Sequence, residues 1–343
     1  MAQTKPTELT VLVDTSVIMH CLSHRLKLID HTKPEWKKLI QAQLTYLVSG
    51  DWLGEMKPDI VRYIFCTDSK PYWRLDYLKR PEVIANVPRK GQLEKKRQSF
   101  KAMLQVIEDL REEGKHFEAR DLLASDEYAS LLKDLEIHYK AGRKLSEYSF
   151  TKLKRFVLKT IKDAGWTMLS KKGYEADDMA ASIIQVNKTL EEPKNIMMLT
   201  IDTDWLGMVS DNVHWFCQHG YYPRMRDDMR SLNIWATKRL GVTIEKPTDI
   251  WVVKGDQGDK ADNIPPSKGA LLPVIDLFNP PQEFKLWENE RYLPTLLKAL
   301  TTKKYYKVNS QPVISYINSC GVNLCVMPYN SHKDIARGEY VLE

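Results

Sequence analysis

The stretch LTVLVDTS, residues 9–16, is a nearly uninterrupted apolar run that leads directly into an acid. Two further segments are built in the same way, IVRYIFC at 60–66 and NIMMLT at 195–200, and VHWFC at 213–217 is a weaker example. Apolar runs without polar alternation are typical of parallel strands that are buried on both faces of a sheet. The sequence therefore predicts a parallel sheet that contains these segments.

Acidic residues follow three of these runs, at the point where each expected strand ends. In open α/β sheets, ligands bind beyond the carboxyl ends of the strands, which lie at one edge. We therefore expect four carboxylates to converge at that edge: Asp14, Asp68, Asp202 and Asp204.

Helical patterns alternate with the strand-like runs. SVIMHCLSHRL (16–26) and YEADDMAASIIQV (174–186) have apolar positions at helical spacing, and the sequence from Leu93 to about Lys162 is helical in pattern and highly charged. Strands that alternate with helices indicate an α/β fold with a central, mainly parallel sheet flanked by helices. The charged segment is interpreted as a helical insertion on this core, and the tail from about Glu288 as mainly helical up to an extended stretch near 322–328.

Two more acidic groups add to those at the strand ends. Glu175, Asp177 and Asp178 fall in the first turn of the expected helix, and KGDQGDKADNIPP (254–266) contains an aspartate at every third position: Asp256, Asp259 and Asp262. Any one of these acids has a simpler explanation, because acids cap helices and interact favourably with the helix dipole. Ten carboxylates in separate clusters, each at the end of an element, are not explained by capping.

Carboxylates gathered in one pocket repel one another unless divalent cations neutralise them. Oxygen ligands without His or Cys favour Mg²⁺ or Mn²⁺ over zinc. Two such ions about 3.5–4 Å apart are the usual apparatus of phosphodiester hydrolysis. His20 and His24 lie four residues apart without the acid of an HExxH motif, so we do not expect a zinc site there.

Basic residues are concentrated in two windows, although the net charge is only +6. Residues 70–101 hold ten Lys/Arg against three Asp/Glu, and residues 140–172 hold ten against two. Such windows attract phosphate backbones or anionic lipid, and a solvated helix face is the plain alternative for either one alone. Two windows beside an acidic cluster favour nucleic acid as the partner.

Neither a membrane span nor a disulfide framework is expected. No stretch of the chain approaches the roughly 18 uncharged apolar residues that a membrane-spanning helix needs. The 5 cysteines lack CxxC spacing, which indicates a reducing compartment. The N-terminus, MAQTKPTEL, lacks the features of a signal peptide, so a cytoplasmic protein is expected.

Five sequence blocks, in the right order and at about the right spacing, resemble the metal-dependent 5′-nuclease superfamily. The blocks are VDTS (13–16), TDS (67–69), YEADDMAA (174–181), TIDTDW (200–205) followed by VSDNV (209–213), and GDQGDKADNIP (255–265). This superfamily includes bacteriophage 5′-exonucleases, the 5′-nuclease domain of bacterial DNA polymerase I and eukaryotic flap endonucleases, and the phage branch is the most similar. The resemblance covers roughly residues 9–265 and implies a PIN-like 5′-nuclease fold with a helical arch.

The resemblance also implies roles for the acids around two Mg²⁺ ions, which Mn²⁺ can replace. The first ion is held mainly by five residues: Asp14, Asp68, Glu175, Asp177 and Asp178. The second is held, directly or through water, by Asp202, Asp204 and a pair from the last block. Within that block Asp259 belongs to both overlapping pairs and is the first choice, Asp256 is the second, and Asp262 is an outer-sphere acid or a helix cap.

The expected arch corresponds to residues ~70–110, where WRLDYLKRPEVIANVPRKG (73–91) resembles the arch sequence of the family. Val83-Ile84 stand where the family has Tyr-Lys, so the lysine that contacts the scissile phosphate is missing from its usual place. We hypothesise that Arg89 and Lys90, or Lys79 and Arg80, stabilise the phosphate instead. The basic residues expected to contact DNA are Arg74, Lys79, Arg80, Arg89, Lys90, Lys96 and Arg97.

The function implied by the resemblance is that of a Mg²⁺-dependent 5′-3′ exonuclease and structure-specific flap endonuclease. It would act on DNA with 5′ single-stranded ends or flaps, in phage DNA replication or primer removal, as a monomer in the host cytoplasm with replication proteins as partners. Residues 1–265 would form the catalytic core, including the arch and insertion (about 70–165), and residues 266–343 a C-terminal, helical DNA-binding region. Two alternatives stay open: an RNase H-like or other RNA-cleaving relative that acts on RNA/DNA hybrids, and a non-catalytic protein that binds branched DNA.

Overall fold

The computed structural model describes most of the chain up to residue 216 and one segment near the C-terminus. The described residues are 8–16, 18–19, 35–49, 58, 60–87, 89, 91–137, 148–200, 202–216, a few positions between 233 and 245, and 280–301. The chain divides into two compact units, which are described separately. The sheet unit comprises residues 1–70, 146–247 and 277–343, and the helical unit comprises 71–145 and 248–276.

A five-stranded parallel sheet with the strand order β3-β2-β1-β4-β5 forms the centre of the sheet unit. The strands are β1 (Glu8–Asp14), β2 (Ile60–Cys66), β3 (Thr167–Leu169), β4 (Asn195–Leu199) and β5 (Val213–Phe216). The four strands expected from apolar runs are confirmed. Strand β3 was not expected, because its three residues, TML, are too few for a periodic signal.

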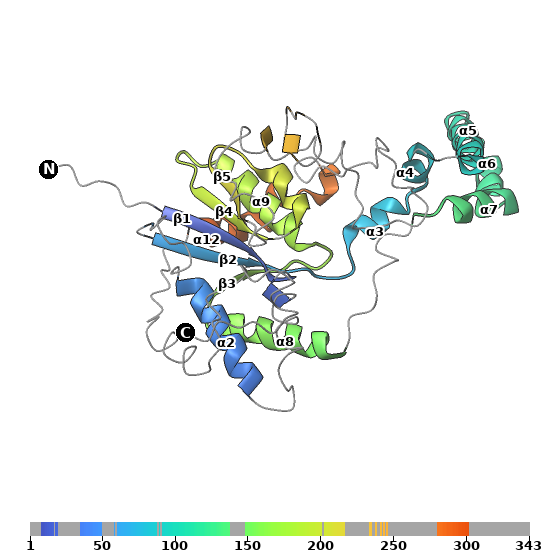
Figure 1. Cartoon of the computed structure of the whole chain (residues 1–343). Helices are drawn as coiled ribbons and strands as arrows, with labels where there is room; N and C mark the ends of the chain where they lie inside the picture. The colour runs from blue at the N-terminus through green and yellow to red at the C-terminus, as the bar shows by residue number, and fades with distance from the viewer. Residues whose placement is uncertain are drawn as a thin grey trace. The chain divides into compact units, whose positions relative to one another are not determined.

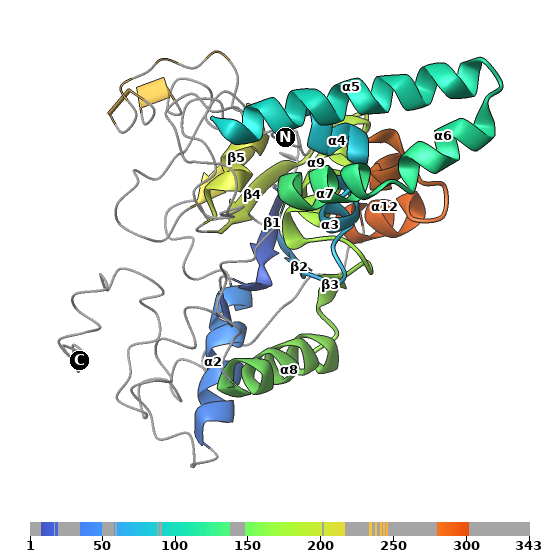
Figure 2. The same cartoon turned by 90° about the vertical axis from the view of Figure 1, so that its right-hand side faces the viewer.

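Helices cover both faces of this sheet (Figures 1 and 2). On one face, alternate strand residues such as Val11, Val13 and Phe65 form a core with Leu44 and Val157 from two helices. These helices are α2 (Glu35–Ser49) and α8 (Tyr148–Asp163). Helix α9 (Ala176–Lys188) packs on the opposite side, against β1 and β2. The predicted α/β class, a parallel sheet flanked by helices, is therefore confirmed.

The segment 280–301 packs onto α9 within the same unit. It contains two short 3-10 helices, η3 (Gln282–Phe284) and η4 (Leu286–Glu288), followed by α12 (Leu293–Thr301). The Tyr292 hydroxyl lies 3.5 Å from the sulfur of Met179 in α9, and burial raises the pKa of Tyr292 to about 12. The buried Arg62 of β2 donates to the carbonyl of Leu300 in the last turn of α12, where the negative end of the helix dipole favours a cation.

The helical unit has a core of its own. Its helices are α3 (Trp73–Leu78), α4 (Pro81–Asn86), α5 (Gln92–Glu112), α6 (His116–Leu123) and α7 (Asp126–Leu135). Phe100 of α5 is fully buried, and its ring centroid lies 5.4 Å from that of Tyr128 in α7. Ile107 and Leu135 belong to the same cluster, so α5 is joined to α7 by apolar packing. Figure 2 shows the length of α5 with α6 and α7 beside it.

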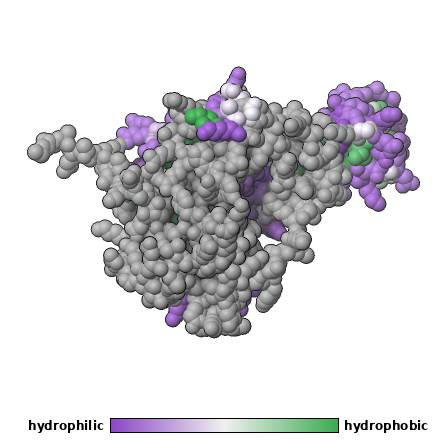
Figure 3. Space-filling model, viewed as in Figure 1, coloured by the Kyte–Doolittle hydropathy of each residue, from purple (hydrophilic) through white to green (hydrophobic). Residues whose placement is uncertain are grey.

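The surface of α5 to α7 is mainly hydrophilic (Figure 3). Among the described residues the large apolar side chains that are exposed are Val106, Phe117 and Ile234. No helix in the described ranges is both long and apolar enough to span a bilayer.

Several expectations fall on residues that the structure does not describe. The helix expected at 16–26 is seen only at its start, and the extended stretch near 322–328 lies outside the described residues. The expected boundary between a core and a C-terminal region at 265/266 stays a prediction.

Candidate metal centre

The ends of β1 and β2 coincide, because Asp14 pairs with Cys66 in the register of the two strands. The hydroxyl of Thr15 donates to the carbonyl of Cys66 at 2.9 Å and fixes this alignment. Ser16 then contacts both acids that follow the strands. Its N–H donates to Oδ1 of Asp14 at 2.9 Å, and its hydroxyl lies 3.5 Å from Oδ2 of Asp68.

The start of α9 brings three more carboxylates to the same edge. Glu175 is the N-cap residue, and its N–H donates to Oδ2 of Asp178 at 2.8 Å. The N–H of Asp178 donates to Oδ1 of Asp177 at 2.9 Å. The N–H of Ala176, the first residue of α9, donates to Oδ1 of Asp68 at 2.7 Å. Asp68 is therefore tied to β1 through Ser16 and to α9 through a backbone N–H.

Glu175, Asp177 and Asp178 form a group that could hold a metal ion. One carboxylate oxygen from each lies within 4.8 Å of the others. Glu175 and Asp178 are buried, and Asp177 is half-buried. A donor set made only of carboxylate oxygens fits a hard divalent cation such as Mg²⁺ or Mn²⁺. Asp14 and Asp68 are not part of the 4.8 Å group, but hydrogen bonds through Ser16 and Ala176 attach them to it.

The thiol of Cys66 is fully buried near these acids. Burial raises its pKa well above the usual value, and the charges of Asp14 and Asp177 raise it further. The protonated thiol therefore acts as a small apolar group at the end of β2.

The second acidic group follows β4. Asp202 precedes the short helix η2 (Thr203–Met208), and its Oδ1 accepts a hydrogen bond from the N–H of Asp204 at 3.0 Å. Asp202 is exposed and Asp204 half-buried. The buried Thr200 joins this group to β1, because its hydroxyl donates to Oδ2 of Asp14 and accepts from the N–H of Asp202, both at 3.0 Å.

The hydroxyl residues around the acids were not expected to belong to the site. The hydroxyl of Ser16 contacts Asp68, and the hydroxyl of Thr200 donates to Asp14. A signal was present in the sequence, since Ser or Thr stands within two positions of Asp14, Asp68 and Asp202.

Four of the expected site residues lie outside the described residues, namely Asp256, Asp259, Asp262 and Lys90. Their roles stay predictions.

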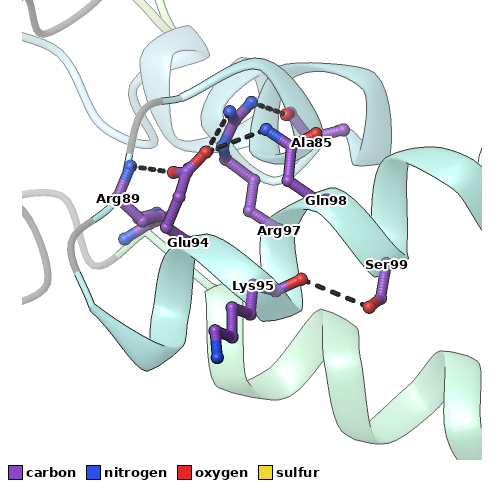
Figure 4. A network of polar contacts seen from close by, with 7 residues as sticks. All are labelled: Ala85, Arg89, Glu94, Lys95, Arg97, Gln98 and Ser99. Atoms are coloured by element: carbon purple, nitrogen blue, oxygen red, sulfur yellow. Dashed lines mark hydrogen bonds and ion pairs between the residues drawn. The ribbon is translucent and has the colours of Figure 1, made fainter.

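Arg89 and Arg97 are engaged inside the helical unit (Figure 4). The guanidinium of Arg97 donates to both carboxylate oxygens of Glu94 and to the carbonyl of Ala85. The N–H of Arg89 donates to the same carboxylate at 2.9 Å, and its side chain reaches the carbonyl of Leu135 at 2.6 Å. Burial, followed by the charge of Arg97, lowers the pKa of Arg89. These contacts connect the 85–97 segment to the end of α7.

The other basic residues differ in exposure. Arg74 is buried, with its guanidinium carbon 4.8 Å from the centre of the Trp73 ring. Arg80 is half-buried over the ring of Tyr77. Lys79 is exposed, and Lys96 is exposed with an ion pair of 2.6 Å to Asp134. Of the described basic residues considered for DNA contact, Lys79 and Lys96 present the most accessible cations.

Comparison with known proteins adds a domain assignment. Residues 85–233 match the family described as 5′-3′ exonuclease, N-terminal resolvase-like domain. The chain is 28% identical over 131 residues to the thermostable DNA polymerase I of Thermus aquaticus, which is 38% of this chain and 14% of that polymerase. For the thermostable DNA polymerase I of Thermus thermophilus the identity is 29% over 131 residues, with the same coverage. The chain thus matches about a seventh of the length of these polymerases.

Two solved structures of bacteriophage T5 proteins are also similar. One is the T5 5′-exonuclease with bound divalent metal ions (zinc), at 17% identity, a TM-score of 0.36, and coverage of 96% of this chain and 98% of that one. The other is the T5 D15 flap endonuclease in a complex with DNA and metal ions, at 15% identity, a TM-score of 0.37 and the same coverage. A TM-score of this size supports no inference about the present chain.

The family match includes the start of α9 and the loop after β4, and therefore the acids of both groups that these segments carry. The resemblance to the metal-dependent 5′-nuclease superfamily is confirmed by this match of residues 85–233 to the 5′-3′ exonuclease N-terminal, resolvase-like domain.

Proposed function

We propose that this protein is a divalent-metal-dependent 5′-3′ exonuclease and flap endonuclease that hydrolyses DNA phosphodiesters near 5′ ends. The observation that carries the proposal is the group of Glu175, Asp177 and Asp178, whose oxygens lie within 4.8 Å of one another. Asp68 is hydrogen-bonded to the same helix start, and Asp14 is joined to Asp68 through Ser16. The family match over residues 85–233 supports the choice of a nuclease.

The carboxylates have distinct tasks in this proposal. Glu175, Asp177 and Asp178, with Asp14 and Asp68 beside them, hold the first of two Mg²⁺ ions. The bound ions supply charge neutralisation at the phosphodiester and lower the pKa of a water molecule toward neutrality. Asp202 and Asp204 are assigned to the second ion. Backbone and hydroxyl donors keep the carboxylates oriented before DNA arrives, which reduces the reorganisation that the reaction requires.

DNA binding is assigned to the basic residues of the helical unit. Lys79 replaces the missing arch lysine in this proposal, because it is exposed, whereas Arg89 is buried and donates to the carbonyl of Leu135. Lys79→Ala is then expected to slow single-turnover cleavage at saturating DNA, and Arg89→Lys to lower the stability of the helical unit. A wild-type cleavage rate for Lys79→Ala would remove Lys79 from this role.

The test of the function uses 5′-labelled flap, nicked-duplex and RNA-primed substrates, each with and without Mg²⁺. We expect Mg²⁺-dependent release of short 5′ products from the flap. Asp177→Asn should slow cleavage by about 100-fold or more, since loss of a ligand costs at least as much as loss of the groups that orient one. Asp163→Asn is the matched control, because Asp163 is exposed at the end of α8 and forms a surface ion pair with Lys159 at 2.5 Å.

The alternatives are outcomes of the same experiment. Preferential cleavage of the RNA-primed substrate would indicate the RNA-cleaving relative. Binding of flap DNA without cleavage in Mg²⁺ or Mn²⁺ would indicate the non-catalytic protein that binds branched DNA. In either case DNA affinity should fall as the salt concentration rises, because lysine and arginine contacts to phosphates release counterions.

A further inference from the structure

The side chain of Thr200 connects two acids that lie far apart in the sequence. Thr200 follows β4 directly and is 1% exposed. Its Oγ1 donates to Oδ2 of Asp14 at 3.0 Å, across 186 positions of the chain. The same oxygen accepts the N–H of Asp202 at 3.0 Å. One hydroxyl thus joins the end of β1 to the loop that carries Asp202 and Asp204.

The bond from Thr200 is one of two that orient the carboxylate of Asp14. Its other oxygen, Oδ1, accepts the N–H of Ser16 at 2.9 Å, so each oxygen of the carboxylate has a donor from a different segment. A carboxylate held at both oxygens has little freedom to rotate. The chain from the N–H of Asp202 through the hydroxyl to the carboxylate is also cooperative, because each hydrogen bond polarises the next.

The position itself does not demand a threonine. A valine has nearly the same shape and is favoured in buried strands, and burying a hydroxyl is unfavourable unless it is hydrogen-bonded. The hydroxyl is therefore explained by its two partners and not by packing.

We propose that Thr200 is a positioning residue for the metal centre, which orients Asp14 and couples it to the Asp202–Asp204 loop. Both groups of carboxylates then depend on one buried hydroxyl. Thr200 acts through these acids and does not itself hold an ion. The inference rests on the proposed function, in which the acids are the metal ligands.

The test is metal binding by the full chain, measured by titration calorimetry with Mn²⁺ and with Mg²⁺. Thr200→Val removes the hydroxyl and keeps the shape, and we expect it to weaken metal binding about 10-fold or more, as loss of a group that orients a ligand does. Thr200→Ser keeps the hydroxyl and should bind metal nearly as well as the wild type. Thr160→Val is the matched control, since Thr160 is a buried threonine of α8 whose hydroxyl donates to the carbonyl of Phe156 at 2.9 Å.

The coupling between Thr200 and Asp14 is measured in a double variant. In the Asp14→Asn background, Thr200→Val should weaken the remaining binding by a smaller factor than in the wild type, because the hydroxyl has lost its anionic partner. Circular dichroism reports whether each variant is folded, and Thr200→Ala replaces the valine variant if that one does not fold.

The outcomes separate this inference from the proposed function. Wild-type metal binding by Thr200→Val, or weak binding by Thr200→Ser equal to that of the valine variant, would overturn the positioning role. A wild-type chain that binds neither Mn²⁺ nor Mg²⁺ would instead overturn the metal dependence on which the proposed function rests.

Discussion

Hydroxyl and backbone N–H groups orient the carboxylates of the candidate metal centre. Asp68 accepts from the N–H of Ala176 through one oxygen and faces the hydroxyl of Ser16 with the other. Asp14 is held in the same way by Ser16 and Thr200. Neutral donors of this kind fix a carboxylate without cancelling its charge, so the acid retains its attraction for a cation.

A charged network elsewhere gives a pH-dependent prediction at the residue scale. Hydrogen bonds from Arg97, from the backbone N–H of Arg89 and from Gln98 lower the pKa of Glu94 from 4.5 to about 2. A carboxyl whose pKa is lower in the folded state stabilises the fold above its unfolded pKa and loses that contribution as the pH falls through the folded value. The ionised Glu94 thus stabilises the helical unit above about pH 4.5 and ceases to do so near pH 2.

Glu94→Gln should therefore be less stable than the wild type at neutral pH, and the difference should shrink between pH 4.5 and 2. Thermal unfolding of both proteins across this range, followed by circular dichroism, measures the difference. Asp109→Asn on the exposed side of α5 is the matched control. A difference that is constant with pH would show that Glu94 titrates normally.

At the scale of elements, α12 belongs to the packing of the sheet unit. Leu296 and Leu300 are fully buried, and α12 and α9 are in contact. Arg62 of β2 donates to the carbonyl of Leu300. This helix therefore supports α9, and α9 carries three carboxylates of the candidate centre at its start.

Leu296→Ala should destabilise the sheet unit by roughly 2–5 kcal/mol, the range for truncating a buried leucine. Urea titration measures the loss of stability. Hydrogen–deuterium exchange of β4 and α9 peptides shows whether this loss lies in the sheet unit. Thr295→Ala is the control, because Thr295 is exposed one position earlier on the same helix. Equal stability of the two variants would mean that α12 contributes little to this unit.

At the scale of the whole molecule, the chain forms two units with separate cores. In the sheet unit, a core cluster lies where α2 and α8 pack on one face of the sheet. The core of the helical unit is built around Phe100. Because the five acids assigned to the first ion, namely Asp14, Asp68, Glu175, Asp177 and Asp178, belong to the sheet unit, binding of that ion should not require an intact helical unit.

Phe100→Ala should lower the stability of the helical unit by about 3–5 kcal/mol, as truncation of a buried aromatic does. Hydrogen–deuterium exchange should quicken in α5 to α7 and stay unchanged in β1 and β4. Calorimetry with Mn²⁺ should give the wild-type affinity for the first ion, whereas cleavage of flap DNA should fall. Loss of Mn²⁺ binding in this variant would contradict the independence of the two units.

The sequence predicted the strands well and the surroundings of the basic residues poorly. Continuous apolar runs indicate buried parallel strands wherever they occur, and an acid directly after such a run must lie near the sheet edge. Arg89 stands in a basic window and was expected to be accessible, but the packing of α5 against α7 buries it. Whether a cation faces solvent depends on which helices meet, and local composition does not contain that information.

By itself the sequence determined the α/β class and the sheet edge at which the acids after β1, β2 and β4 lie, because these follow from strand periodicity and parallel topology. Only the tertiary structure decided how the acids are held. Thr200 and Asp14 are 186 positions apart, and Asp68 and Ala176 are 108 apart. The first contact arises from the register of β1 with β4, and the second joins the residues after β2 to the start of α9. The register is a property of the assembled sheet, since each strand is matched to its neighbours by packing on both faces and not by its own residues alone.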